Sequence, residues 1–134
     1  METRITSFLG NRLRIELELL TTPSGKVVAN LRPTGPMITS ERETISQALA
    51  AADDASGAFV VLDITETEQV DHTGLGEILL LNGRMRLSKR HFSLVVREGS
   101  VANYLGKYGV LKIVKDRTVE GRPAALPLEA DGLS

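Results

Sequence analysis

The stretch "FVVLDITETEQVDHTGLGEILLL", residues 59–81, places a polar tetrad between two apolar segments. Residues 59–64 form a continuous apolar run broken by one aspartate, which is typical of a strand buried on both faces of a parallel or mixed sheet. From Leu75 to about Lys89 the apolar spacing becomes helical. The tetrad, residues 71–74 (DHTG), therefore lies at a strand-to-helix junction.

The segments before this junction predict a hairpin and a helix. Residues 12–20 alternate between apolar and charged side chains, as a half-buried strand does, and residues 26–31 predict the strand that closes an N-terminal β-hairpin. Ser40 and Glu43 have the spacing of a capping box. Behind them an apolar stripe predicts a helix that reaches about Ala52.

Three further elements are predicted after the junction helix. They are a buried strand at 92–96, a helix at 101–108 and a short strand at 111–114. Because strands and helices alternate, the order indicates an α/β domain in which helices pack against a mixed β-sheet. We expect one domain over residues 1–116 and a flexible C-terminal tail over residues 117–134, which has two prolines and little periodicity.

The composition is that of an ordinary globular protein. Of the 134 residues, 42% are hydrophobic and 25% charged. The formal net charge of -1 does not indicate a protein that binds nucleic acid. The count of Cys is 0, which excludes disulfides, thiolate metal sites and a cysteine nucleophile. No apolar run resembles a signal-peptide core or approaches the roughly 20 residues of a membrane span. We therefore expect a soluble, cytoplasmic protein.

Catalysis and metal binding fit the tetrad poorly. Adjacent side chains point in different directions, so Asp71, His72 and Thr73 do not supply a nucleophile, a base and an orienting group. The two histidines, His72 and His91, lack the spacing of metal ligands. The G-x-G that follows lacks the third glycine of a dinucleotide fingerprint and the lysine of a P-loop. We expect no catalytic residue, no metal and no cofactor.

A hydroxyl at a helix start has two possible uses. Thr73 has the position of an N-cap for a helix that starts near Gly74, and Glu77 falls in the first turn, where it would complement the helix dipole. A phosphate on Thr73 would also meet free backbone N–H groups there, and would add close to two negative charges to the surface. The residues alone leave a simple cap and a phosphorylated switch as alternatives.

The tetrad and its surroundings resemble the STAS domain of anti-sigma factor antagonists. "FVVLDITETEQVDHTGLGEIL" is similar to the family's strand, loop and Asp-Ser/Thr-Ser/Thr-Gly-Leu-Gly helix start, and "HFSLVVREGSVANYLGKYGVLKIV" is similar to its later strand, helix and final strand. The resemblance covers a core of residues 27–115 and implies a STAS-type mixed sheet. It also implies that Thr73 is the phosphorylated residue, and that Asp71, His72 and Gly74 shape the site.

This family regulates bacterial transcription by partner switching. By the resemblance, the unphosphorylated protein binds an anti-sigma factor that is also its GHKL-type serine/threonine kinase. Phosphorylation of Thr73 releases it, and a PPM-type phosphatase restores binding. The protein itself would be neither an enzyme nor a nucleic-acid-binding protein. The helix that starts near Gly74 has more apolar residues than one buried stripe requires, so part of it is expected to bind the partner. The expected partner face comprises Met37, Thr39, Thr73, Leu75, Gly76, Ile78 and Leu79.

The sequence departs from the family pattern at two places. Many relatives carry "G-E-L-D" where residues 35–38 read "GPMI", and His72 stands where a second Ser or Thr is common. The alternative function is a non-catalytic STAS scaffold or subunit, in a stressosome-like assembly or regulating a lipid transporter, that phosphorylation does not control. A ligand sensor is the third alternative, and formation of a homodimer is also left open.

Overall fold

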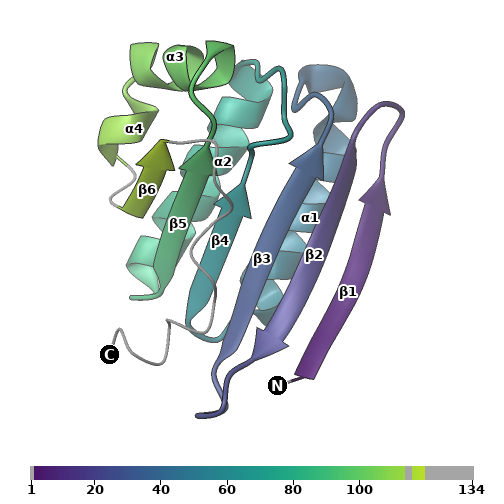
Figure 1. The fold of residues 1–134 in the computed structure, drawn as a ribbon, viewed down its shortest axis with the longest axis vertical. Coiled ribbons are helices and arrows are strands. Elements are labelled where there is room, and N and C mark those ends of the chain that lie inside the picture. The colour runs from purple at the N-terminus through teal and green to yellow at the C-terminus, as the bar shows by residue number, and fades with distance from the viewer. Residues whose placement is uncertain (1, 114–115, 120–134) are drawn as a thin grey trace.

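The computed structural model describes residues 2–113 and 116–119, which form a six-stranded sheet with helices on one face (Figure 1). The strands lie in chain order: β1 (Glu2–Leu9), β2 (Arg14–Thr21), β3 (Val27–Thr34), β4 (Phe59–Asp63), β5 (His91–Val96) and β6 (Asp116–Val119). β1, β2 and β3 pair antiparallel, whereas β3 to β6 pair parallel. The predicted α/β fold with a mixed sheet is therefore confirmed.

Helices connect the parallel strands, because a parallel pair needs a long crossover. They are α1 (Arg42–Ala55), α2 (His72–Leu87), α3 (Ser100–Lys107) and α4 (Val110–Ile113), with a short 3-10 helix, η1 (Thr39–Glu41), before α1. α1 and α2 lie side by side behind the sheet, and α3 lies beyond the end of β5 (Figure 1). In the described residues no helix is long and apolar enough to cross a membrane.

The hydrophobic core fills the space between the sheet and the pair α1 and α2. Alternate residues of the inner strands supply its floor: Ile15, Leu17, Ala29, Leu31, Val60, Leu62, Leu94 and Val96. The helices cover it with the predicted stripe Ile45, Ala48, Leu49 and Ala52 on α1, and with Ile78, Leu81 and Met85 on α2. This packing fixes which face of α2 is left for solvent.

The predicted N-terminal hairpin is confirmed, and a strand that the sequence did not predict lies beside it. β2 and β3 pair antiparallel with Leu17 opposite Leu31. Their turn contains Gly25 at φ +87°, a conformation that glycine adopts without steric cost. β1 adds an edge strand along β2, but its side chains are exposed along almost its whole length. It therefore carries no alternation of buried and exposed residues to detect.

The C-terminal elements correct two predictions. The strand predicted at 111–114 is wrong, because Val110–Ile113 forms α4 with Val110 fully buried. A four-residue apolar run fits either element, so periodicity could not separate them. The last strand, β6, begins at Asp116 and places Arg117 beside Leu94 of β5, so the predicted tail cannot begin at residue 117. Residues 120–134 of that tail lie outside the described residues.

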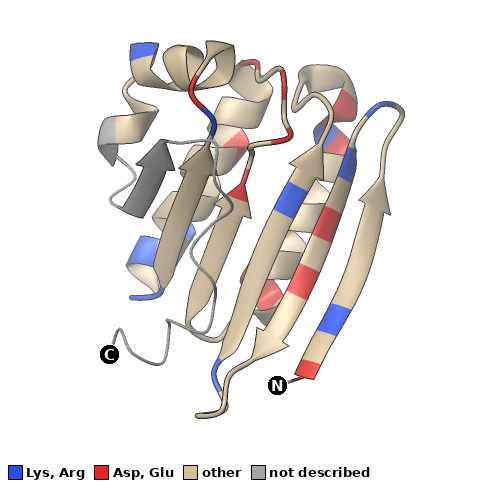
Figure 2. Ribbon diagram, in the orientation of Figure 1, with Lys and Arg blue, Asp and Glu red and all other residues tan. Residues whose placement is uncertain are grey.

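The neighbouring strands β2 and β3 carry charged residues of both signs (Figure 2). Glu16 on β2 lies directly opposite Arg32 on β3, a cross-strand pairing that favours this register. Arg32 also lies 3.8 Å from the buried carboxylate of Asp63, at the end of β4. Across the described part of the chain, Figure 2 shows acidic and basic residues interspersed rather than gathered into a basic stripe.

Candidate functional site

α2 begins at the tetrad, and its N-cap is Asp71 rather than Thr73. Oδ1 of Asp71 accepts hydrogen bonds from the backbone N–H of Thr73 at 2.8 Å and of Gly74 at 3.3 Å. The helix therefore starts at His72, whose side chain is exposed, and the predicted Thr73 cap is wrong. An aspartate at this position reaches the second and third helical N–H groups. The hydroxyl of Thr73 is thus left for another contact.

The Thr73 hydroxyl contacts Thr39, which the second carboxylate oxygen of Asp71 holds in place. Oδ2 of Asp71 accepts hydrogen bonds from the backbone N–H of Thr39 at 2.9 Å and from its Oγ1 at 3.0 Å. Oγ1 of Thr39 lies 2.7 Å from Oγ1 of Thr73. Thr39 is exposed and Thr73 is half-buried, so two hydroxyls from distant segments meet at the surface over one carboxylate. We call Thr39, Asp71 and Thr73 the hydroxyl cluster.

The hydrogen bonds of the hydroxyl cluster keep Asp71 ionised. Burial raises the pKa of the Asp71 carboxyl, but hydrogen bonds from Thr39, Gly74 and Thr73 lower it by more, so that its pKa lies below the usual 3.8. At neutral pH the group is a carboxylate, which can only accept hydrogen bonds. Its negative charge also complements the positive end of the α2 dipole.

Gly74 lets the loop before η1 cross closely over the start of α2. A Cβ at Gly74 would overlap the carbonyl oxygen of Met37 and come within 3.0 Å of Cγ1 of Val70. The same Met37 carbonyl accepts a hydrogen bond from the Asp71 backbone N–H at 3.2 Å, and Met37 forms a parallel β-bridge with Val70. Gly74 therefore shapes the site by bringing the backbone that carries Thr39 against the tetrad.

The residues predicted to form the partner face differ in their exposure to solvent. Thr39 and Gly76 are exposed, and Thr73, Leu75 and Leu79 are half-buried. Met37 and Ile78 are 0% exposed, so their assignment to the partner face is wrong: both belong to the core. Leu80 is 50% exposed and lies on the outer side of α2 instead. We call the accessible residues Thr39, Thr73, Leu75, Gly76, Leu79 and Leu80 the α2 docking surface, which is the candidate partner face.

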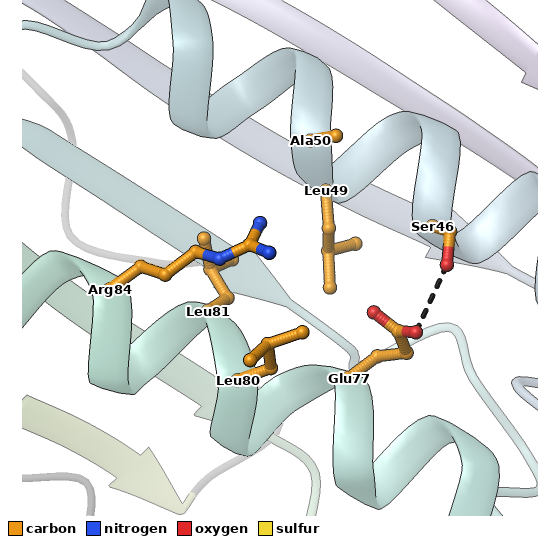
Figure 3. Close-up of a pocket in the computed structure, with 7 residues that line it drawn as sticks. All are labelled: Ser46, Leu49, Ala50, Glu77, Leu80, Leu81 and Arg84. Carbon is orange, nitrogen blue, oxygen red and sulfur yellow. Dashed lines mark hydrogen bonds between the residues drawn. The ribbon is translucent and has the colours of Figure 1, made fainter.

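A groove between α1 and α2 borders the α2 docking surface (Figure 3). Oγ of Ser46 donates to Oε1 of Glu77 at 3.0 Å across it, so Glu77 ties α2 to α1 rather than lying in the first turn as predicted. Leu49 and Leu80 line the middle of the groove, and Arg84 extends over its far end (Figure 3). The groove thus joins apolar and charged groups next to the helix start.

Glu41, which the sequence did not single out, organises the start of α1. Its side chain is 3% exposed, and Oε1 accepts hydrogen bonds from the backbone N–H of Asn11 at 2.7 Å and of Arg12 at 3.2 Å. The predicted capping box of Ser40 and Glu43 does not form, because Glu41 is the N-cap residue and no side chain caps α1. Glu41 instead ties the turn between β1 and β2 to η1, which carries Thr39.

Other chemistry has little support in the described part of the chain. Within residues 2–113 and 116–119 no group of three or more His, Asp or Glu side chains is placed to hold a metal ion. His72 is exposed at the start of α2, whereas the ring of His91 stacks on Phe59 with 5.6 Å between the ring centroids. The hydroxyl cluster is therefore the candidate site.

Comparison with known proteins identifies the fold. A solved structure, "Structure of the Anti-Sigma Factor Antagonist SpoIIAA in its Unphosphorylated Form", is similar to this chain with a TM-score of 0.50 and 14% sequence identity. The match covers 97% of this chain and 96% of that one. No family model and no curated protein matches the chain. The protein therefore shares the mixed-sheet α/β fold of that structure, as its sequence predicts.

Proposed function

We propose that this protein is an anti-sigma factor antagonist-like regulator whose binding to an anti-sigma factor is controlled by phosphorylation of Thr73. The hydroxyl cluster is the observation that carries the proposal. It presents the Thr73 hydroxyl at the surface, 2.7 Å from Thr39 Oγ1 and next to the ionised Asp71 that caps α2. The fold, which is that of an unphosphorylated antagonist, supports the same function.

A phosphate on Thr73 would act on binding through charge. It adds close to two negative charges at the second residue of α2, where the helix dipole favours them and the domain stays folded. The ionised Asp71 is already there, and the half-buried Leu75 and Leu79 lie nearby on the α2 docking surface. A partner that covers this surface must desolvate the new charges, which typically costs several kcal/mol. Phosphorylation therefore releases the partner.

The proposal includes the enzymes that set the phosphorylation state. The partner is an anti-sigma factor that is also a GHKL-type serine/threonine kinase, and a PPM-type phosphatase removes the phosphate. The protein itself catalyses nothing and acts as a soluble, cytoplasmic component. Its contacts with the partner come from the α2 docking surface.

The test is phosphorylation of the full chain by the GHKL-type kinases of its source genome, with Mg-ATP. Intact-mass spectrometry and peptide mapping are expected to find one phosphate, on Thr73. Thr73→Ala should abolish it, whereas Ser40→Ala, which removes an exposed hydroxyl of η1 outside the cluster, should leave it unchanged. Phosphate that persists in Thr73→Ala would contradict the proposed site.

A second function, a STAS scaffold without control by phosphorylation, is favoured by one observation. The Thr73 hydroxyl already has a short contact with Thr39, and in this function its role is purely structural. The α2 docking surface would then bind a partner whatever the state of Thr73. Equal binding of a partner by phosphorylated and unphosphorylated chains would support this function.

A further inference from the structure

We infer that Thr39 positions the Thr73 hydroxyl for phosphorylation. Thr39 accepts a hydrogen bond from this hydroxyl, which leaves the lone pairs of Thr73 Oγ1 free for the incoming phosphoryl group. The inference rests on the proposed function, because it concerns how the same site takes up phosphate. Thr39 is a positioning residue here: it acts through Thr73 and contacts neither the nucleotide nor the phosphorus.

The directions of the hydrogen bonds follow from counting hydrogens. The carboxylate of Asp71 can only accept, so the 3.0 Å contact with Thr39 Oγ1 uses the hydroxyl hydrogen of Thr39. A hydroxyl has one hydrogen to donate. The hydrogen in the 2.7 Å contact between the two Oγ1 atoms must therefore come from Thr73. Thr73 is held as a donor, and its lone pairs point away from Thr39.

Thr39 can hold this geometry because η1 is fixed at both of its ends. At the first residue, the Thr39 backbone N–H donates to Asp71 Oδ2 at 2.9 Å. At the last residue, the Glu41 backbone N–H donates to the carbonyl of Ile38 at 2.9 Å, and its buried carboxylate binds the backbone N–H of Asn11 at 2.7 Å. Groups held in position before a reaction lower its entropic cost.

The transfer step is balanced with a nucleoside triphosphate as the phosphoryl donor. Oγ1 of Thr73 forms a bond to the γ-phosphorus, and the bond from that phosphorus to the β–γ bridging oxygen breaks, so that the diphosphate leaves with the electron pair. The proton of the Thr73 hydroxyl is released to water as the new O–P bond forms, so Thr39 orients the hydroxyl and takes up no proton.

The inference is tested with Thr39→Val, which removes the hydroxyl at nearly constant shape, and Thr39→Ser, which restores it. Both are assayed with Mg-ATP and a GHKL-type kinase that phosphorylates the wild-type chain. Thr39→Val is expected to lower kcat for phosphorylation of Thr73 by about 10- to 100-fold. Because Thr39 also belongs to the α2 docking surface, the KM for the protein substrate is measured separately, and a rise in KM without a fall in kcat would overturn the inference. Thr39→Ser should recover the wild-type kcat, and Ser40→Ala is the matched control without an effect.

A second readout uses the unphosphorylated protein alone. The three-bond Hα–Hβ coupling of Thr73, measured by NMR, should report one rotamer in the wild type and in Thr39→Ser, and rotamer averaging in Thr39→Val. Unchanged coupling in Thr39→Val would overturn the inference. If Thr39→Val does not fold, Thr39→Ala takes its place in both experiments.

The kinetic outcomes separate this inference from the proposed function. Wild-type kcat in Thr39→Val would overturn the inference and leave the proposed function standing, because Thr73 would still be phosphorylated. A loss that Thr39→Ser does not recover would also overturn it, since the claim concerns the hydroxyl. If no kinase places phosphate on Thr73 of the wild type, the proposed function fails and the inference fails with it.

Discussion

Two helix starts in this molecule are each organised by one carboxylate, but the two carboxylates have different partners. Glu41, before α1, is 3% exposed and binds the backbone N–H groups of Asn11 and Arg12. Asp71, before α2, is half-buried, and besides backbone N–H groups it binds the hydroxyl of Thr39. The buried carboxylate fixes a turn, whereas the accessible one holds two hydroxyls at the surface. If the proposed function holds, stability and function are separable by substitution.

The largest effect on stability is expected from Glu41→Gln. The amide presents an N–H group to the N–H donors of Asn11 and Arg12, and hydrogen bonds to a charged group contribute about 1.5–3 kcal/mol. We expect the free energy of unfolding to fall by about 2–3 kcal/mol, measured by urea denaturation. A loss below that of the equivalent change at Asp71 would contradict the assignment of Glu41 as the structural carboxylate.

Substitution of two glycines by alanine extends the comparison and should have a smaller effect on the free energy of unfolding. A Cβ at Gly74 would overlap the backbone oxygen of Met37, whereas a Cβ at Gly83, also in α2, would meet nothing within 4 Å. Overlap with a backbone atom forces the structure to shift, so Gly74→Ala should lower the free energy of unfolding by about 1–3 kcal/mol. Gly83→Ala is the matched control and should cost less. The reverse order would show that the contact with Met37 relaxes easily.

The smallest effect is expected from Asp71→Asn, because the asparagine Oδ1 still caps α2 and only the contacts with the exposed Thr39 are lost. The difference in stability between the two proteins should shrink as the pH falls. The pKa of Asp71 is lowered in the folded state, so its stabilising contribution is present above about pH 4 and is lost as the pH falls through the folded pKa. Urea unfolding at pH 7 and at pH 3 measures this. A pH dependence that is identical in wild type and Asp71→Asn would contradict the hydrogen-bonded carboxylate.

The parts of the fold that local patterns encode were predictable from the sequence. The hairpin of β2 and β3, the buried stripe of α1 and the junction of β4 with α2 each have a periodicity or a motif within one short segment. β1 has no such pattern because its side chains are exposed, and α4 is too short for its period to differ from that of a strand. Elements without a repeated burial pattern escape this kind of prediction.

The candidate site was predictable in its residues but not in its contacts. The tetrad pointed to Asp71 and Thr73, but it predicted Thr73 as the N-cap, whereas the backbone geometry makes Asp71 the N-cap. The contacts of Asp71 with Thr39 and of Glu41 with Asn11 join residues about 30 positions apart, which no local spacing encodes.

The most direct test of the account compares how Thr73→Ala and Thr73→Glu bind the kinase that phosphorylates the wild type, by isothermal titration calorimetry. Neither variant removes the Asp71 cap, so both should remain folded. Thr73→Ala should bind as the unphosphorylated wild type does. Thr73→Glu places a charge that the interface must desolvate, at a cost of about 3–5 kcal/mol, so its Kd should rise by roughly 100-fold or more. Thr3→Glu, on the exposed strand β1, controls for added charge and should bind normally. Equal Kd values for Thr73→Ala and Thr73→Glu would contradict control by phosphorylation and favour the scaffold.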